Sequence, residues 1–261
     1  MADSILFVTM APNIFAVIAG VGPGTGAAVV RKFAQAYPVV LLARKEESYS
    51  SLVKEINEAG GSALGVATDV SVGSSITAAF EKIKAKFGSD ATCALMEDLA
   101  AVFNASGTLV KKPFLELTED DFTKPYAVSG KGAFHFSQAV LPHLLASAAT
   151  TPKYNPTLIF TGATAALKGS AGFSTFASAK FAQRALAQSL AREFAPQGIH
   201  VSHVIIDGVI DIPSSKEYLK DAGPNAKINT DAIAEAYWQL HTQHLSAMTH
   251  EIEIRPFIEK W

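Results

Sequence analysis

The feature that most constrains the fold of this chain is an alternation of short apolar runs with longer segments of helical period. The runs have the length of buried strands and are too short for core helices. They are Phe15–Gly20, Val39–Ala43, Ala63–Thr68, Ala100–Asn104, Thr157–Thr161 and His200–Ile206. The helical segments between them lie at about 25–36, 46–59, 72–87, 121–147 and 174–195. This order predicts a three-layer α/β/α fold, a doubly wound parallel sheet flanked by helices on both faces.

After the sixth run the pattern loosens. Residues 207–224 contain Pro213, Gly223 and Pro224 and are interpreted as a loop, and a further helix is expected at about 230–241. Alternating Glu and Ile in Glu251–Ile254 predict a last strand with one covered face. We find no linker rich in Pro, Gly and Ser between two halves. The sequence therefore predicts a single domain over residues 1–261, with a loop and helix lid at about 207–245.

Composition excludes several classes of protein. The chain is 49% hydrophobic with 22 Lys and Arg against 24 Asp and Glu. It is too apolar for disorder and lacks the basic excess that nucleic acid requires. The single cysteine, Cys93, leaves no internal disulfide, and no apolar stretch approaches the ~20 residues of a membrane span. Because Met1–Pro12 also lacks the basic start of a secretory signal, we expect a cytoplasmic protein with neither nucleic acid nor membrane as a partner.

A glycine turn directly follows the first predicted strand. The segment Ala19–Gly26 leads into a helical segment and allows two registers, Gly20-x-x-x-Gly24-x-Gly26 and Gly22-x-Gly24-x-x-Ala27. The first places its leading glycine at the strand end and is preferred. In such a Rossmann-type setting the glycines let the backbone approach a pyrophosphate at the helix N-terminus. Gly20, Gly24, Thr25 and Gly26 are the expected contacts; an ordinary tight turn is the alternative.

The end of the second predicted strand bears on the choice of dinucleotide. A carboxylate in this region commonly binds the ribose hydroxyls of NAD, whereas an arginine accommodates the 2′-phosphate of NADP. Here the strand ends in Leu42–Lys45, so Arg44 and Lys45 precede the first carboxylate, Glu46. The sequence favours NADP(H), unless Arg44 is simply a solvated charge.

Further motifs make the chain similar to the short-chain dehydrogenase/reductase family over about residues 14–255. Its glycine turn resembles the family's TGxxxGxG, with Ala19 in the Thr place, and Ala195–Val201 resembles APxGIRV. Asp69-Val70 resembles the pair that contacts adenine, and Asn104-Ala105-Ser106 resembles the NAG after the fourth strand. The resemblance implies an NAD(P)-binding domain whose cofactor contacts include the following residues: Asp69, Val70, Asn104, Ala105, Lys180, Gly208 and Ile210.

The residues expected for catalysis depart from the family pattern. The resemblance implies a Tyr four residues before a Lys, a Ser thirteen residues before that Tyr, and an Asn on the preceding helix. Lys180 is present, but Phe176 takes the Tyr place, Ala163 the Ser place and Ser129 the Asn place. Phenylalanine has no proton to give to an alkoxide, and a general acid typically contributes ~10²–10⁴-fold. With no Tyr to activate, the family role that Lys180 keeps is binding the nicotinamide ribose.

Other side chains are candidate proton donors or metal ligands. Thr164 flanks the vacant Ser place, Tyr126 lies one helical turn before Ser129, and Asp207 and Asp211 follow the sixth strand. Each also has a packing or capping interpretation. The histidine pairs His200 with His203 and His241 with His244 lack the spacing or the third ligand that a metal needs, so no metal site is expected.

Two functions follow from this pattern. The leading prediction is an NADP(H)-dependent oxidoreductase acting on a small molecule that needs no protein acid, such as an imine or iminium, with Lys180, Ser129, Thr164 and Phe176 around the reacting atoms. The alternative is a catalytically silent dinucleotide-binding sensor or assembly subunit. The resemblance also implies a homodimer or homotetramer built through the helices at about 121–147 and 174–195.

Overall fold

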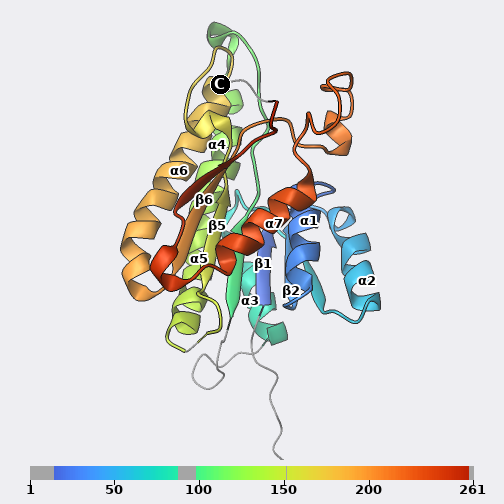
Figure 1. Cartoon of the computed structure of the whole chain (residues 1–261). Helices are drawn as coiled ribbons and strands as arrows, with labels where there is room; N and C mark the ends of the chain where they lie inside the picture. The colour runs from blue at the N-terminus through green and yellow to red at the C-terminus, as the bar shows by residue number, and fades with distance from the viewer. Residues whose placement is uncertain (1–14, 88–97, 151, 259–261) are drawn as a thin grey trace, which may run out of the picture.

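The protein forms one seven-stranded parallel sheet with helices on both faces (Figure 1). The computed structural model describes residues 15–87, 98–150 and 152–258; Cys93 and Met1–Pro12 lie outside them. The strands follow the spatial order β3-β2-β1-β4-β5-β6-β7, and each pairs in parallel with its neighbour. Their bounds are β1 Phe15–Ala19, β2 Val39–Ala43, β3 Ala63–Ala67, β4 Leu99–Phe103, β5 Thr157–Thr161, β6 His200–Ile206 and β7 Glu251–Ile254.

The predicted α/β fold class is confirmed, and every predicted strand is present. All residues of β1, β2, β4, β5 and β6 are buried, as expected of strands covered on two faces. The edge strand β7 alternates only weakly in burial, and Glu253 is its exposed residue. The run of apolar residues was therefore a reliable signal, because burial on both faces requires apolar side chains at every position.

Seven α-helices join and cover these strands. They are α1 Thr25–Ala34, α2 Ser50–Glu58, α3 Gly73–Phe87, α4 Glu119–Tyr126, α5 Gly132–Ala148, α6 Ser174–Phe194 and α7 Thr230–His241, counted in the described part of the chain. Short 3₁₀ turns lie at Glu46–Ser48, Phe114–Glu116, Thr164–Ala166, Ala195–Gln197, Pro213–Ser215 and Leu245–Ala247.

Each face of the sheet has its own apolar core. On one face β-strand side chains pack with α3, α5 and α6, and Phe103 and Phe136 are fully buried there. On the other face they pack with α1, α2 and α7, where Phe33 and Tyr237 are among the buried residues. Figure 1 shows α7 lying beside α1 on the same face of the sheet, although some 200 residues separate them along the chain. The helix expected at about 230–241 is thus part of the covering layer.

Two predicted helices are interrupted. The helix expected at about 121–147 is α4, then a π-helical turn at Ala127–Lys131, then α5. Pro125 near the end of α4 has no N–H to continue the hydrogen-bond ladder. The helix expected at 46–59 breaks at Tyr49, whose side chain is buried over Gly65 and whose φ of −132° is not helical. A proline accompanies the first interruption, and tertiary packing of Tyr49 accompanies the second.

No helix in the described part of the chain combines the length and the apolar character needed to cross a lipid bilayer.

Candidate cofactor and substrate site

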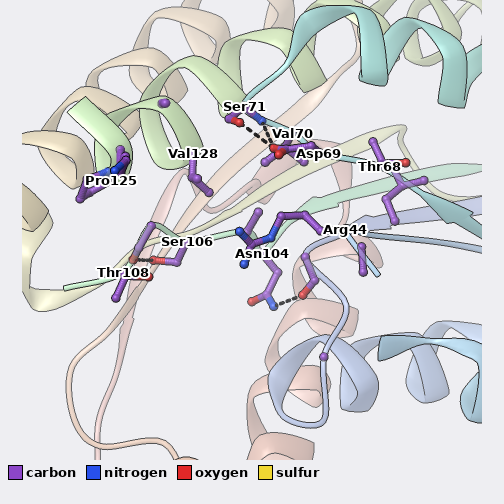
Figure 2. Close-up of a pocket in the computed structure, with 18 of the residues that line it drawn as sticks. Arg44, Thr68, Asp69, Val70, Ser71, Asn104, Ser106, Thr108, Pro125 and Val128 are labelled. Carbon is purple, nitrogen blue, oxygen red and sulfur yellow. Dashed lines mark hydrogen bonds between the residues drawn. The ribbon is translucent and has the colours of Figure 1, made fainter. Parts of the chain in front are cut away.

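Two cavities meet at the carboxyl ends of the central strands, where open α/β sheets bind ligands. The first encloses about 580 Å³ beside β2, β3 and α4, and the second about 650 Å³ beside β5 and α6. Gly20, Gly22, Asn104 and Ser106 line both, so the two form one continuous groove over the glycine turn. Figure 2 shows the first cavity.

The glycine turn is built for close backbone contact. Gly20 has a φ of +92°, and a Cβ there would lie 2.4 Å from the Ala105 nitrogen. A Cβ on Gly26 would lie 2.6 Å from the Gly20 oxygen, and one on Gly24 2.5 Å from Ile212 Cγ2. At Gly22 no heavy atom lies within 4 Å of the Cβ place. These distances support the register Gly20-x-x-x-Gly24-x-Gly26.

The turn fits the phosphates of a dinucleotide. Gly24 stands at the N-cap of α1 with no side chain, so no side chain caps the helix, and its first turn holds no acidic residue. The leading N–H groups and the positive end of the helix dipole therefore face the groove. Gly24, Thr25 and Gly26 line it and would hold the pyrophosphate.

Two basic side chains, Arg44 and Lys45, line the first cavity beside the end of β2. Arg44, exposed at the end of β2, extends across the cavity toward Asn104 in Figure 2. Within the described residues neither Arg44 nor Lys45 forms an ion pair, so both are able to meet an added phosphate. Asp69 lies opposite and accepts hydrogen bonds from the Ser71 N–H at 2.9 Å and its hydroxyl at 2.6 Å. Asp69 and Val70 line the cavity, as do Asn104 and Ala105.

Lys180 lies on α6 at the wall of the second cavity. Its side chain is buried, and Nζ donates to the Thr161 carbonyl at 2.9 Å and to Gln183 Oε1 at 3.0 Å. Burial lowers the pKa of Lys180 to about 7, because the charged ammonium loses its hydration. Phe176, one turn earlier, places its ring centroid 5.8 Å from Nζ. A partly neutral amine thus adjoins a ring that has no hydroxyl.

A buried hydrogen-bond chain supports the floor of the groove. Asn104 Nδ2 donates to the Gly20 oxygen at 3.0 Å, and Asn104 Oδ1 accepts from the Thr161 hydroxyl at 3.0 Å. The Tyr237 hydroxyl lies 2.7 Å from Thr161 Oγ1 and must donate to it, because the Thr161 proton is already committed to Asn104. Burial raises the pKa of Tyr237 far above its ordinary value, so this hydroxyl keeps its proton. The chain connects α7 with the glycine turn.

The vacant Ser place has a polar neighbour. Ala163 and Thr164 both line the second cavity, together with Gly208 and Ile210 from the segment after β6. The Thr164 hydroxyl donates a short hydrogen bond to Asp207 Oδ1, and Asp207 Oδ2 lies 3.2 Å from Arg255 Nη2. Asp207 stands behind Thr164 and does not itself line the cavity.

Three candidates lie away from the groove. Ser129, expected near the reacting atoms, is fully buried in the π-helical turn, accepts the Gly107 N–H at 3.0 Å and lines neither cavity. The Tyr126 ring packs where a Cβ of Gly130 would lie, 2.9 Å away. Asp211 is largely exposed, 3.8 Å from Lys227.

The histidines have structural partners. His203 Nδ1 lies 2.9 Å from Glu251, His200 bonds the Thr249 carbonyl, and His241 contacts Tyr37 and Thr157. Among the described residues no group of three His, Cys, Asp or Glu side chains is arranged to hold a metal.

Sequence reasoning missed Gln183, Tyr237 and Arg255. Gln183 lies three residues after Lys180, a spacing that places both on one helix face and would have revealed it. Tyr237 and Arg255 come from α7 and the segment after β7, far away in sequence, so only the fold brings them to Thr161 and Asp207.

Comparisons with known proteins agree with this geometry. The sequence profile of the short chain dehydrogenases matches residues 15–222. The 4-formylbenzenesulfonate dehydrogenase of Comamonas testosteroni is 31% identical over 248 residues, which cover 90% of this chain and 92% of that protein. A staphylococcal relative, an uncharacterized oxidoreductase of Staphylococcus epidermidis, is 26% identical over 92% of this chain and 96% of its own length.

Solved structures share the fold. The crystal structure of a short-chain dehydrogenase from Rhodopseudomonas palustris superposes with a TM-score of 0.74 at 34% identity, over 95% of this chain and 100% of that one. A metagenomic short-chain oxidoreductase in complex with NADP superposes with a TM-score of 0.75 at 23% identity, over 96% of this chain and 100% of that one. From its matched profile, its relatives and its groove, this chain belongs to the short-chain dehydrogenase/reductase family of oxidoreductases.

Proposed function

We propose that this protein is an NADP(H)-dependent oxidoreductase that transfers hydride to a small organic substrate without a tyrosine acid. The observation that carries the proposal is the groove itself. One end combines a glycine cradle with Arg44 and Lys45, which form no ion pair with the residues that the structure describes. The other end holds Lys180 beside Phe176. A phosphate-binding end is thus joined to a reaction end that lacks a strong proton donor.

Residues of the groove divide into four positions along the cofactor. Arg44 would bind the 2′-phosphate, and Asp69 with Val70 would border the adenine. The glycine turn with Thr25 would hold the pyrophosphate, and Asn104 would position the floor beneath the ribose. Lys180 would donate to the nicotinamide ribose hydroxyls, with Gly208 and Ile210 closing the far wall. When bound there, NADPH supplies a hydride.

The substrate class follows from the missing acid. A ketone that receives hydride becomes an alkoxide and needs a proton at once, which Phe176 cannot provide. An iminium carbon needs none, because hydride addition neutralises a positive charge already present. The relative from Comamonas is named for an aldehyde substrate. We therefore propose that the protein prefers an imine or iminium over a carbonyl compound as its substrate.

Parallel fluorescence titrations with NADPH and NADH test the cofactor. We expect NADPH to bind more tightly, because Arg44 adds a charge-assisted contact worth about tenfold or more in affinity. Arg44→Ala is expected to remove that difference and leave NADH binding unchanged. Arg192→Ala, an exposed arginine on α6 whose guanidinium bonds the Gln188 carbonyl, serves as the control. Absence of binding of either nucleotide would refute the site assignment.

A second function is favoured by Phe176 and Ala163 specifically. A dinucleotide-binding sensor or assembly subunit needs the glycine cradle and Lys180 but no acid. It predicts tight NADPH binding with no NADPH consumption over a broad set of imines and carbonyl compounds. Consumption of NADPH with any of them above the buffer rate excludes this function.

We also propose that residues 1–261 act as one NAD(P)-binding domain, in which the segment at about 207–245 closes the groove. Support comes from Gly208, Ile210, Ile212 and Pro213, which line the second cavity.

We further propose a homodimer or homotetramer through α5 and α6. Support for this comes from large apolar side chains exposed on those helices, Phe134 at 45% and Phe181 at 42%.

A further inference from the structure

Three residues joined by a hydrogen bond and an ion pair lie behind the vacant Ser place. Thr164, at the wall of the second cavity, donates its hydroxyl proton to Asp207, which is ion-paired with Arg255. The Asp207 side chain is 18% exposed and that of Arg255 17%. Glu253 in turn contacts Arg255. These residues come from the end of β5, the end of β6 and the segment after β7. Three segments at the carboxyl ends of the strands therefore fix their geometry.

The ion pair decides which way the Thr164 proton points. The Asp207 carboxylate, paired with the Arg255 guanidinium, accepts hydrogen bonds and donates none. Thr164 must therefore donate to Asp207. A hydroxyl has one proton and two lone pairs, so the Thr164 oxygen keeps lone pairs for another partner. Thr164 lines the second cavity, so a bound ligand would lie beside this residue.

This polarity is the reverse of what a carbonyl substrate needs. A carbonyl oxygen at this wall would meet the lone pairs of Thr164 with the negative charge of Asp207 behind them. An N–H group would donate to the same oxygen, and a positive charge on the nitrogen would be attracted to Asp207. The second cavity contains one charged side chain, Lys180, whose Nζ already donates to Thr161 and Gln183.

We propose that Thr164, oriented by Asp207, is the specificity-determining residue for a substrate that presents a cationic N–H at the reacting carbon, that is, a protonated imine. This inference rests on the proposed hydride transfer and names its substrate class. In the reaction the carbon of C=N(H)⁺ gains the hydride with its two electrons, the C=N π pair moves to nitrogen, and a neutral amine forms. The N–H remains on nitrogen, so Thr164 accepts the same proton throughout and none is transferred.

Three probes separate the two features that Thr164 and Asp207 recognise. Methylpyrroline, a cyclic imine, has charge and an N–H when protonated; its N-methyl iminium salt has charge alone; cyclopentanone has neither. Thr164→Val keeps the shape and removes the oxygen. We expect Thr164→Val to lower kcat/KM for methylpyrroline about tenfold or more, because the lost hydrogen bond has a charged donor. For the N-methyl salt, which has no N–H, kcat/KM is expected to change little. Thr164→Ser, which retains the hydroxyl, is expected to keep most of the activity.

Asp207→Asn keeps an acceptor for Thr164 and removes the charge. We expect Asp207→Asn to lower kcat/KM for both charged probes. The decrease in kcat/KM for cyclopentanone is expected to be smaller. The matched control is Thr77→Val, an exposed threonine on α3 that lines neither cavity, which is expected to behave as wild type. Equal losses of Thr164→Val on all three probes, or a wild-type preference for cyclopentanone, would overturn the proposal.

Calorimetric titration of protonated pyrrolidine into the protein, with and without NADP⁺, gives a readout that does not depend on turnover. We expect the wild type and Thr164→Ser to bind it more tightly than Thr164→Val. Equal affinities contradict the role of Thr164. Failure of the wild type to bind NADPH at all, with pyrrolidine still distinguishing Thr164→Val, would refute the proposed function and leave this recognition intact.

Discussion

Lys180 is fully buried and makes two hydrogen bonds to oxygen acceptors. Its acceptors, the Thr161 carbonyl and Gln183 Oε1, hold Nζ at the wall of the groove. Because burial lowers the pKa to about 7, the group is an ammonium below that pH and an amine above it. Charge-assisted hydrogen bonds are roughly twice as strong as neutral ones.

This titration makes a prediction for cofactor binding. If Lys180 donates to the nicotinamide ribose, NADPH affinity is expected to fall by a factor of roughly several as the pH rises from 6.5 to 9. The decrease is expected because the donor loses its charge. Titrations of Lys180→Met should give weaker binding that changes less over the same pH range. A wild-type profile parallel to that of the variant would contradict the role of Lys180.

The missing acid makes a second prediction at this scale. Ala163 and Phe176 line the cavity beside Lys180, so Ala163→Ser with Phe176→Tyr places a hydroxyl pair beside an existing amine. We expect NADPH-dependent reduction of cyclopentanone to rise about 100-fold or more, at the lower end of general-acid catalysis. The rate is followed by NADPH absorbance, with Phe176→Tyr alone as the comparison. An unchanged rate in a variant that still binds NADPH favours the sensor function.

Among the elements, the glycine turn depends most on single residues. Gly20 and Gly26 each lie where a Cβ would overlap backbone atoms, whereas Gly22 has open space around it. Gly26→Ala is expected to lower the free energy of unfolding by about 1–3 kcal/mol, because backbone must shift to admit the methyl group. Gly20→Ala is expected to lower it at least as much, because its φ of +92° adds strain.

Urea unfolding of the cofactor-free protein measures this effect. Gly22→Ala is the matched control, and its midpoint should lie close to that of the wild type. NADPH binding, measured separately, is expected to weaken in Gly26→Ala. Equal stability of the Gly22→Ala and Gly26→Ala proteins would show that the turn relaxes more easily than its packing indicates.

The local sequence pattern does not indicate where α4 ends and α5 begins. The sequence predicts one continuous helix at about 121–147, yet Ala127–Lys131 is π-helical. Ser129 faces inward there and bonds the Gly107 N–H. Its place in the family motif predicted a role at the groove, but the side chain is too short to leave this internal acceptor position.

At the scale of the whole molecule, buried histidines connect the last strands with α7. Burial lowers the pKa of His203 to about 4 and that of His241 to about 3, and it also lowers the pKa of His200. In the unfolded chain their pKa values return to about 6.5. Between pH 6.5 and about 4 the unfolded state therefore binds more protons than the folded state, and stability falls as the pH falls.

We expect the Tm to decrease steadily from pH 7 to pH 4.5. His241→Gln removes one of these proton-binding groups, so its Tm should depend less steeply on pH even if the protein is less stable throughout. The exposed His244 provides the control, since His244→Gln should keep the wild-type slope. A Tm that rises on acidification, or equal slopes in His241→Gln and wild type, would contradict this account.

Assembly is the other property of the whole molecule. The double variant Phe134→Glu and Phe181→Glu is expected to convert the proposed oligomer into a monomer, because two charges would be buried at an apolar contact. Sedimentation velocity measures the mass in solution, with Phe257→Glu, exposed beyond β7, as the comparison. A wild-type monomer would refute the proposed oligomer.

The amino-acid sequence by itself determined the layers, the strands and most of the groove. Buried parallel strands require continuous apolar runs, and the glycine turn and Arg44 follow from their places at strand ends. The resemblance to a known family, rather than local spacing, singled out Asn104 and Lys180. The tertiary structure alone decided how Thr164 is polarised, because Asp207 and Arg255 come from different strand ends. It also decided that Ser129 is internal, since hydrogen bonds between segments distant in sequence leave no local pattern.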